Sequence, residues 1–190
     1  MGTLHDLIAP FAVAVASGLT EVYNEFSLQH ELGIFLRGKL PNYKVQFERN
    51  VSFFFPSSNV AFTKREIDIA VYSLSKKGLR YSIELKYPRN GQHPEQMFSF
   101  CKDVAFAEEL NAAGFQTAGL VIFAADHLFY GGATEGIYGF FRGGQPLCGR
   151  IQKPTGRKDA EVNLRGCYDV IWKPISGSLK YAVIEVGHGI

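Results

Sequence analysis

Apolar positions along this chain recur with two different periods, which predict helices and strands in a definite order. Between Asn24 and Gly38 the apolar residues fall on one face of an α-helix. These residues are Leu28, Leu32, Phe35 and Leu36. Asn24 or Ser27 can cap the start of this helix, and Gly38 followed by Pro41 can end it. The next segment, Tyr43–Phe53, alternates apolar and polar residues and is predicted to be a β-strand.

Two short β-rich runs separated by a polar turn predict a hairpin. The first run, EIDIAVYS, covers Glu66–Ser73, and the second, YSIELKY, covers Tyr81–Tyr87. Pro88 is expected to end the second strand, because proline has no N–H to donate to a sheet.

A helix and a buried strand are expected to follow the hairpin. Pro94 suits the first turn of a helix, which should extend to about Ala113. Thr117–Ala125 is continuously apolar, as is typical of a strand buried on both faces. A strand, a helix and a buried strand in succession predict a right-handed parallel crossover. Two more strands are expected at Tyr168–Trp172 and Tyr181–Val186.

These elements predict one α/β domain over residues 1–190. Its core would cover about residues 24–125, in the order helix, three strands, helix, strand (αβββαβ), with a central mixed β-sheet flanked by helices. Residues 126–190 would form a loop-rich β extension with additional strands. A chain of this length can bury a self-sufficient core without disulfides or zinc.

Composition and charge exclude several classes of protein. Twenty Lys and Arg against eighteen Asp and Glu give a formal charge of +2, so any affinity for nucleic acid must come from a local patch. The three cysteines, Cys101, Cys148 and Cys167, are odd in number and form no C-x-x-C pair, which argues against a zinc finger or a disulfide framework.

The apolar stretch Leu7–Leu19 does not have the pattern of a targeting segment. Asp6 precedes it, Pro10 interrupts it, and no Lys or Arg occurs before Arg37, so neither a signal peptide nor a transmembrane helix is expected. We therefore expect a cytoplasmic protein with no membrane partner.

The predicted hairpin places three charged residues together. If the apolar faces of its strands coincide, Asp68, Glu84 and Lys86 share the opposite face. A turn centred on Lys76 would put Asp68 opposite Glu84, and one centred on Lys77 would put it opposite Lys86. In either register the two carboxylates would lie roughly 5–8 Å apart. Either these charges cover a solvated strand face, or they hold a divalent cation such as Mg²⁺, which takes one or two carboxylates.

This arrangement resembles the PD-(D/E)XK nuclease superfamily, which includes restriction endonucleases, Holliday-junction resolvases and RecB-type nucleases. Glu84-Leu85-Lys86 matches the (D/E)-x-K half of the motif. Asp68 matches the Asp of the first half, and Ile67 stands where the family name has Pro. The resemblance covers about residues 24–125 and includes the order of the elements.

The resemblance implies a restriction endonuclease-like core and an Mg²⁺- or Mn²⁺-dependent nuclease, with DNA favoured as the polymer. Asp68, Glu84 and the backbone carbonyl of Leu85 would hold the metal ion. Lys86 would position the attacking water and stabilise the developing charge. Cutting of both DNA strands would suggest a homodimer, although no interface can be identified in the sequence.

Two helical residues also match features of this superfamily. Glu31 lies beside the apolar stripe of the first helix and is either a further metal ligand or a surface carboxylate. Gln96 and Phe100 are similar to the Q-x-x-x-Y motif of RecB- and lambda-exonuclease-like members, with Phe in place of Tyr. Only Gln96 is therefore carried over as a catalytic candidate, and it could equally be a polar residue of the helix N-terminus.

Two alternatives to a nuclease remain. A non-catalytic module on the same fold could bind nucleic acid or a protein, for instance in a prokaryotic defence system, using the basic residues between Arg142 and Lys173. A small-molecule enzyme could use Asp126 and His127 after the buried strand, but the chain has neither a Walker motif nor a dinucleotide-binding glycine motif.

Overall fold

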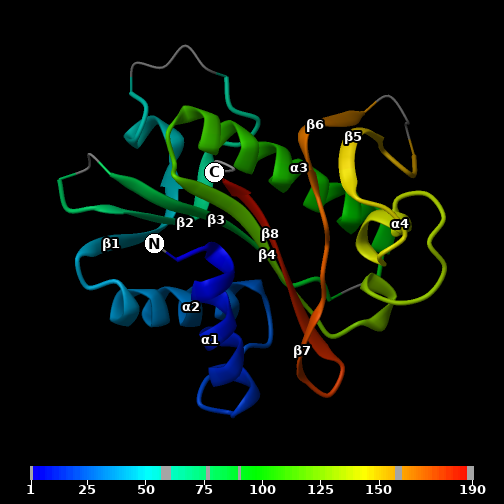
Figure 1. Cartoon of the computed structure of the whole chain (residues 1–190), viewed down its shortest axis with the longest axis horizontal. Coiled ribbons are helices and arrows are strands. Elements are labelled where there is room, and N and C mark those ends of the chain that lie inside the picture. The colour runs from blue at the N-terminus through cyan, green and yellow to red at the C-terminus, as the bar shows by residue number, and fades with distance from the viewer. Residues whose placement is uncertain (1, 57–60, 76–77, 90, 157–159, 188–190) are drawn as a thin grey trace.

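A mixed six-stranded β-sheet with helices on both faces forms the centre of the protein (Figure 1). The computed structural model describes residues 2–56, 61–75, 78–89, 91–156 and 160–187. The elements are α1 (Leu4–Ala16), α2 (Glu25–Lys39), β1 (Tyr43–Asn50), η1 (Val51–Phe53), β2 (Glu66–Ser73), β3 (Leu79–Lys86), α3 (His93–Ala113), β4 (Thr117–Ala124), η2 (His127–Phe129), α4 (Tyr138–Phe141), β5 (Leu147–Gln152), β6 (Glu161–Tyr168), β7 (Lys173–Ser176) and β8 (Leu179–Gly187).

The predicted order of the core elements is confirmed. The chain runs from α2 through β1, β2 and β3 to α3 and β4. Neighbouring strands in the large sheet follow the order β1-β2-β3-β4-β8-β7. Strands β3 and β4 are parallel and are connected by α3, whereas the other neighbours are antiparallel. The parallel pair requires a long crossover, and α3 supplies it.

The sheet separates two apolar cores. On one face, α1 and α2 pack through residues such as Leu28, Leu32 and Phe11 against Ile69 and Ile83. On the other face, α3 packs against the alternate residues of β4 and β8, and the β5–β6 hairpin lies on the far side of α3 (Figure 1). Alternating side chains along each central strand therefore serve two different cores, which explains their nearly continuous apolar sequences.

Helix α1 is an element that the apolar pattern of its segment did not assign. Thr3 and Asp6 form a capping box at its start, in which each side chain accepts a hydrogen bond from the other's backbone N–H. Its buried residues are spaced as one helical face. They are Leu4, Ile8, Phe11 and Ala12. No helix within the described parts of the chain is long and apolar enough to cross a membrane.

Several predicted boundaries are wrong, most clearly in the last third of the chain. Tyr168 ends β6 instead of beginning a strand, and the next strand starts at Lys173. The residues between them leave the small β5–β6 sheet for the large one, and the indole N–H of Trp172 donates to the carbonyl of Phe141 on the way. Strands β5 and β6 were not predicted. The strand predicted at Tyr181–Val186 lies within β8 and is confirmed.

The first predicted strand is shorter than its alternating pattern suggested. β1 ends at Asn50, whose side chain accepts a hydrogen bond from the N–H of Ser52 and starts a short 3₁₀ turn. Asn and Asp commonly bond to the backbone two residues later, and this local bond competes with strand pairing.

Candidate functional site

Asp68 and Glu84 lie beside each other where β2 begins and β3 ends. Ile69 pairs with Ile83 and Ala70 with Ser82, and the same register places Asp68 opposite Glu84. This is the first of the two registers that the sequence allowed. The regular backbone pairing of the two strands stops at Ile69. Beyond this point, carboxylate side chains accept hydrogen bonds from backbone N–H groups of the opposite strand. The carboxylate of Asp68 accepts from the N–H of Leu85 at 2.7 Å, and the N–H of Asp68 donates to Glu84 Oε1 at 3.4 Å.

A third carboxylate approaches Asp68 from the opposite neighbouring strand. The β1–β2 register pairs Phe47 with Ile69 on one side of Glu48 and Arg49 with Ile67 on the other. Glu48 itself has φ 45°, an unusual left-handed conformation for a residue with a side chain. Gln29 Nε2 of α2 donates both to Glu48 Oε1 at 2.5 Å and to the carbonyl of Asp68 at 3.0 Å. Glu48, Asp68 and Glu84 therefore lie on three adjacent strands.

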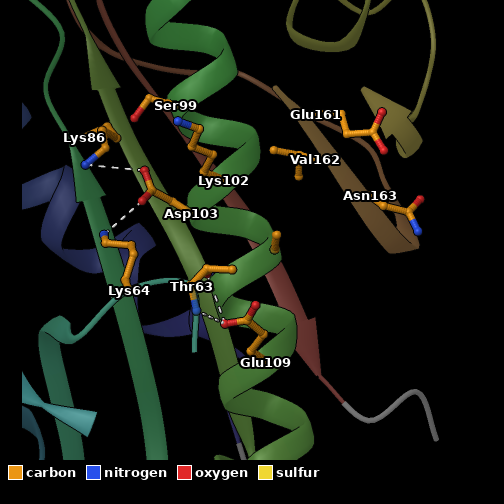
Figure 2. A pocket seen from close by; sticks show the side chains of 11 residues that line it. Thr63, Lys64, Lys86, Ser99, Lys102, Asp103, Glu109, Glu161, Val162 and Asn163 are labelled. Carbon is orange, nitrogen blue, oxygen red and sulfur yellow. Dashed lines mark hydrogen bonds and ion pairs between the residues drawn. The ribbon is translucent and has the colours of Figure 1, made fainter. Parts of the chain in front are cut away.

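Glu84 belongs to a buried network of alternating charges. Its side chain is 1% exposed and accepts from the ammonium group of Lys64, which also donates to Asp103 Oδ1 at 2.9 Å. Lys86 Nζ lies 3.4 Å from Asp103 Oδ2. Figure 2 shows Lys64 and Lys86 both directed toward Asp103, which projects from α3. Two lysines and two carboxylates thus lie together between β3 and α3.

Burial and like charge make the carboxyl groups here unusually basic. Burial first and the Asp68 carboxylate second raise the pKa of Glu84 to about 8, and the Lys64 ammonium opposes this only in part. Burial also raises the pKa of Asp68, although its bond from Leu85 acts in the opposite direction. Burial lowers the pKa of Lys64, but the carboxylates of Glu84 and Asp103 outweigh it and raise the pKa above its usual value. These carboxylates therefore favour a proton or a cation as neighbour.

Two pockets open next to this network. The larger, of about 570 Å³, extends across α3, with Lys64 and Lys86 on one side of the helix and residues of β6 on the other (Figure 2). Its lining includes Lys64, Lys86, Lys102, Ser99 and Asp103. Within the described parts of the chain, no carboxylate lies within ion-pair distance of Lys102, whose ammonium lies 5.2 Å from the centre of the Phe98 ring. This pocket, hereafter the lysine pocket, contains three lysines and also the carboxylates of Asp103, Glu109 and Glu161. Because Lys64 and Lys86 already pair with carboxylates, Lys102 is the lysine of this lining that is available to an anionic ligand.

The smaller pocket, of about 270 Å³, is lined mainly by acidic and polar groups. Its residues are Glu25, Phe26, Gln29, Glu48, Asp68 and Leu85. Lys86 links it to the lysine pocket, because its Nζ lies 3.6 Å from Glu25 and donates to the carbonyl of Leu85 at 2.9 Å. Asp68 thus lines the smaller pocket, and Asp103 lines the lysine pocket.

The structure does not bring Glu31 and Gln96 into this group. Glu31 contacts His30 at 3.2 Å, and the α2 residues that face the group are Glu25 and Gln29. Glu31 lies two positions beyond Gln29, which turns it by roughly 200° around the helix. Gln96 Nε2 donates to the carbonyl of Gly91 at 2.5 Å, a local bond at the start of α3.

Lys64 and Asp103 were not among the site residues predicted from the sequence. Lys64 precedes β2 in an irregular segment, and Asp103 occupies a turn of α3 that is otherwise mostly apolar. A charged residue among the apolar positions of a buried helix face is the one signal that could have identified Asp103.

Three basic residues of the segment between Arg142 and Lys173 contact other protein groups. Arg142 donates to the carbonyls of Leu128 and Ala133, Arg150 pairs with Glu161, and Lys153 lies 3.6 Å from Glu95. Arg157 and Lys158 lie outside the described residues.

Asp126 caps the short η2 turn by accepting from the N–H of Leu128 at 3.0 Å. It also lies 2.6 Å from His93 Nε2 at the start of α3, a pair that the sequence did not suggest. His127 is exposed, and its Nδ1 lies 4.0 Å from the Asp126 carboxylate.

Comparison of the chain with protein-family models, with curated proteins and with solved structures found no match. Within the described residues, no group of three or more His, Cys, Asp or Glu side chains is arranged to hold a metal ion. The resemblance to PD-(D/E)XK nucleases therefore rests on the residues themselves and on the order of the elements.

Proposed function

We propose that the protein is a metal-dependent nuclease of the PD-(D/E)XK type, with a restriction endonuclease-like core, that hydrolyses phosphodiester bonds. The observation that carries this proposal is that Asp68 and Glu84 lie side by side on β2 and β3, with Lys86 of the lysine pocket close to them on β3. Paired carboxylates that could hold a metal ion, with lysine ammonium groups beside them, are groups that support phosphodiester hydrolysis. DNA is the expected polymer on family resemblance.

The oxygen donors at this position suit Mg²⁺ or Mn²⁺. Asp68, Glu84 and the carbonyl of Leu85 are hard ligands, and Mg²⁺ keeps several waters and needs only one or two carboxylates. Burial is the main cause of the raised pKa values of both carboxyl groups, because it disfavours their charged forms, and a bound cation would stabilise those charged forms. A bound Mg²⁺ lowers the pKa of its water and neutralises charge on a phosphate.

The protein's own groups would orient the substrate and stabilise charge. Lys86 presents an ammonium group beside the Leu85 carbonyl and is held there by Asp103 and Glu25. This position suits stabilisation of the negative charge that develops on the phosphate. Lys102 and Ser99, which line the same pocket, would contact neighbouring phosphate oxygens.

A cleavage assay tests the proposal. The wild type, Glu84→Gln and Lys86→Met are incubated with supercoiled, linear and single-stranded DNA and with RNA, in Mg²⁺, Mn²⁺ or EDTA. We expect metal-dependent cleavage by the wild type and a loss of about 10²–10³ in rate for Lys86→Met, by analogy with removing one transition-state donor. Glu84→Gln should lose at least as much.

Glu31→Gln is the matched control, because it removes a carboxylate that lies outside the group. It should cleave at the wild-type rate. Activity that survives Glu84→Gln and Lys86→Met would place the chemistry elsewhere, and absence of cleavage on every substrate would reject the proposal.

The contact between Lys64 and Glu84 favours a second candidate, a non-catalytic module that binds nucleic acid or a protein on the same fold. In such a protein the lysine would serve as a permanent counter-ion for the buried carboxylate. This candidate predicts no cleavage by the wild type and salt-sensitive nucleic-acid binding that Lys102→Met weakens.

A further inference from the structure

Cys148 of β5 and Cys167 of β6 lie directly opposite each other in the two-stranded sheet. Opposed residues in antiparallel strands have Cα atoms about 4.5–5.5 Å apart, within the roughly 4.4–6.8 Å that a disulfide spans. Both side chains are free thiols, and a hydrogen bond joins Cys167 to Cys148. The two sulfur atoms are thus already neighbours in the reduced protein.

The strands are held in this register from the side of α3. The β5–β6 pairing shifts after Cys148, so that Gly149 pairs with Leu164. The extra residues are Arg165 and Gly166, and their backbone N–H groups donate to the carboxylate of Glu108 at 2.7–3.0 Å. The Tyr168 hydroxyl donates to the same carboxylate at 2.7 Å. Since Gly166 and Tyr168 face α3, Cys167 between them points away from the helix.

We infer that Cys148 and Cys167 form a site of oxidative modification, at which a hydroperoxide converts the two thiols into a cross-strand disulfide. One thiolate attacks the terminal peroxide oxygen and becomes a sulfenic acid, and the peroxide leaves as water or an alcohol. The second thiol then attacks the sulfenic sulfur, so that an S–S bond forms and water is released. The pair loses two electrons and two protons, and the peroxide is reduced.

The third cysteine provides an internal contrast. Cys101 is fully buried in α3, donates to the carbonyl of Met97 and has its pKa raised by burial to about 12. The hydrogen bond with Cys148 also raises the pKa of Cys167, so access to solvent is what distinguishes the pair from Cys101. A thiol without access to solvent is inert toward peroxides. Cys167 is exposed and Cys148 is half-buried, so a small hydroperoxide reaches only this pair.

The disulfide should stabilise the hairpin. Strands β5 and β6 form a sheet of only two strands, an arrangement that is marginal without support from neighbours. A covalent link between them restricts the unfolded chain, which raises stability when the native geometry already suits the bond. Strand β6 also contributes Glu161, Val162 and Asn163 to the lysine pocket, so the disulfide would fix one wall of that pocket.

Hydrogen peroxide treatment of the full chain tests the inference. Thiols are counted with a chromogenic disulfide reagent after denaturation, and tryptic peptides are analysed by mass spectrometry without reduction. We expect three thiols before treatment and one afterwards. A linked pair of peptides covering residues 143–150 and 166–180 should appear, lighter by two hydrogen atoms than their sum. The melting temperature of the oxidised protein should exceed that of the reduced protein.

Three single variants serve as controls. Cys101→Ser should still form the linked peptides, whereas Cys148→Ser and Cys167→Ser should form none and gain no thermal stability. The inference is overturned if the wild type keeps all three thiols under conditions that oxidise a model dithiol. It is equally overturned if Cys101 enters the link, if the bond forms only between chains, or if the bond lowers the melting temperature.

Discussion

The ammonium group of Lys64 donates a hydrogen bond to the buried carboxylate of Glu84. A second contact, 2.9 Å long, joins the same ammonium to Asp103 on α3. Lys64 thus supplies the positive charge that two buried carboxylates require, at the position where the proposed function calls for a divalent cation. If a metal ion binds as proposed, the two cations would compete for Glu84, which leads to the first prediction.

Replacement of Lys64 by methionine should strengthen metal binding. Lys64→Met removes the competing charge but keeps much of the side-chain volume, so Glu84 and Asp103 are left without this counter-ion. Without metal the variant should be destabilised by about 3–5 kcal/mol, the usual effect of breaking a buried pair. Millimolar Mn²⁺ should raise its melting temperature more than that of the wild type, through preferential binding to the folded state.

Lys102→Met is the control for this measurement, since Lys102 lines the same pocket and contacts the Phe98 ring instead of a carboxylate. Its Mn²⁺-induced shift should equal the wild-type shift. A smaller shift in Lys64→Met than in Lys102→Met would show that Lys64 does not compete with the metal.

The stability of the metal-free protein should fall as the pH rises from about 4.5 to about 8. Over this range the folded state keeps the proton of Glu84, whose pKa is raised from 4.5 to about 8, while the unfolded state has released it. The folded state thus binds one more proton than the unfolded state, and its stability falls by at most about 1.4 kcal/mol per pH unit as the pH rises. Urea unfolding in EDTA at several pH values measures this slope.

The variant Glu84→Gln should lose this component of the slope, whereas Glu31→Gln, altered at a carboxylate outside the group, should keep it. Parallel stability curves for the wild type and Glu84→Gln across this pH range would contradict a raised pKa at Glu84.

Loss of the Glu108 carboxylate should loosen the β5–β6 hairpin. Glu108→Ala leaves the N–H groups of Arg165 and Gly166 and the hydroxyl of Tyr168 without their acceptor. Unsatisfied buried donors cost about 1–3 kcal/mol each, so the variant should be destabilised by at least that amount. Denaturant unfolding gives the total, and amide hydrogen exchange should be faster in residues 161–168.

The control for Glu108 is Glu161→Ala, which breaks an exposed pair with Arg150 and should cost less than about 1 kcal/mol. Equal effects of the two substitutions would mean that Glu108 does not anchor the hairpin.

Two glycines of α2 should respond oppositely to alanine. A Cβ at Gly33 would lie 2.1 Å from the Phe47 ring of β1, so either the ring must turn away or the helix must shift. We expect Gly33→Ala to destabilise the protein by about 1–3 kcal/mol, the usual effect of overpacking. At Gly38 a Cβ meets no atom within 4 Å, and Gly38→Ala should stabilise by up to about 1 kcal/mol. Thermal unfolding of both variants checks this, and a neutral Gly33→Ala would contradict the close helix–strand contact.

The amino-acid pattern alone determined the central part of the fold. Alternation and helical periodicity are local properties of the chain, so α2, the three strands, α3 and β4 could be predicted in order and nearly in extent. The same alternation predicted that Asp68 lies near Glu84. In an antiparallel hairpin the residue numbers of each pair add up to the same sum, so the position of the turn fixes which residues pair. Strands β5 and β6 were not predicted, because their pairing depends on contacts with α3.

The surroundings of these carboxylates were decided only by the tertiary structure. Lys64 and Asp103 come from a loop and from a helix far along the chain, and they meet Glu84 only because α3 packs across β3. Glu31 was a candidate by residue type, but the rotation of α2 against the sheet turns Glu25 and Gln29 toward Asp68 instead. Local sequence sets which side chains share a helix face, and packing between elements selects which face meets the site.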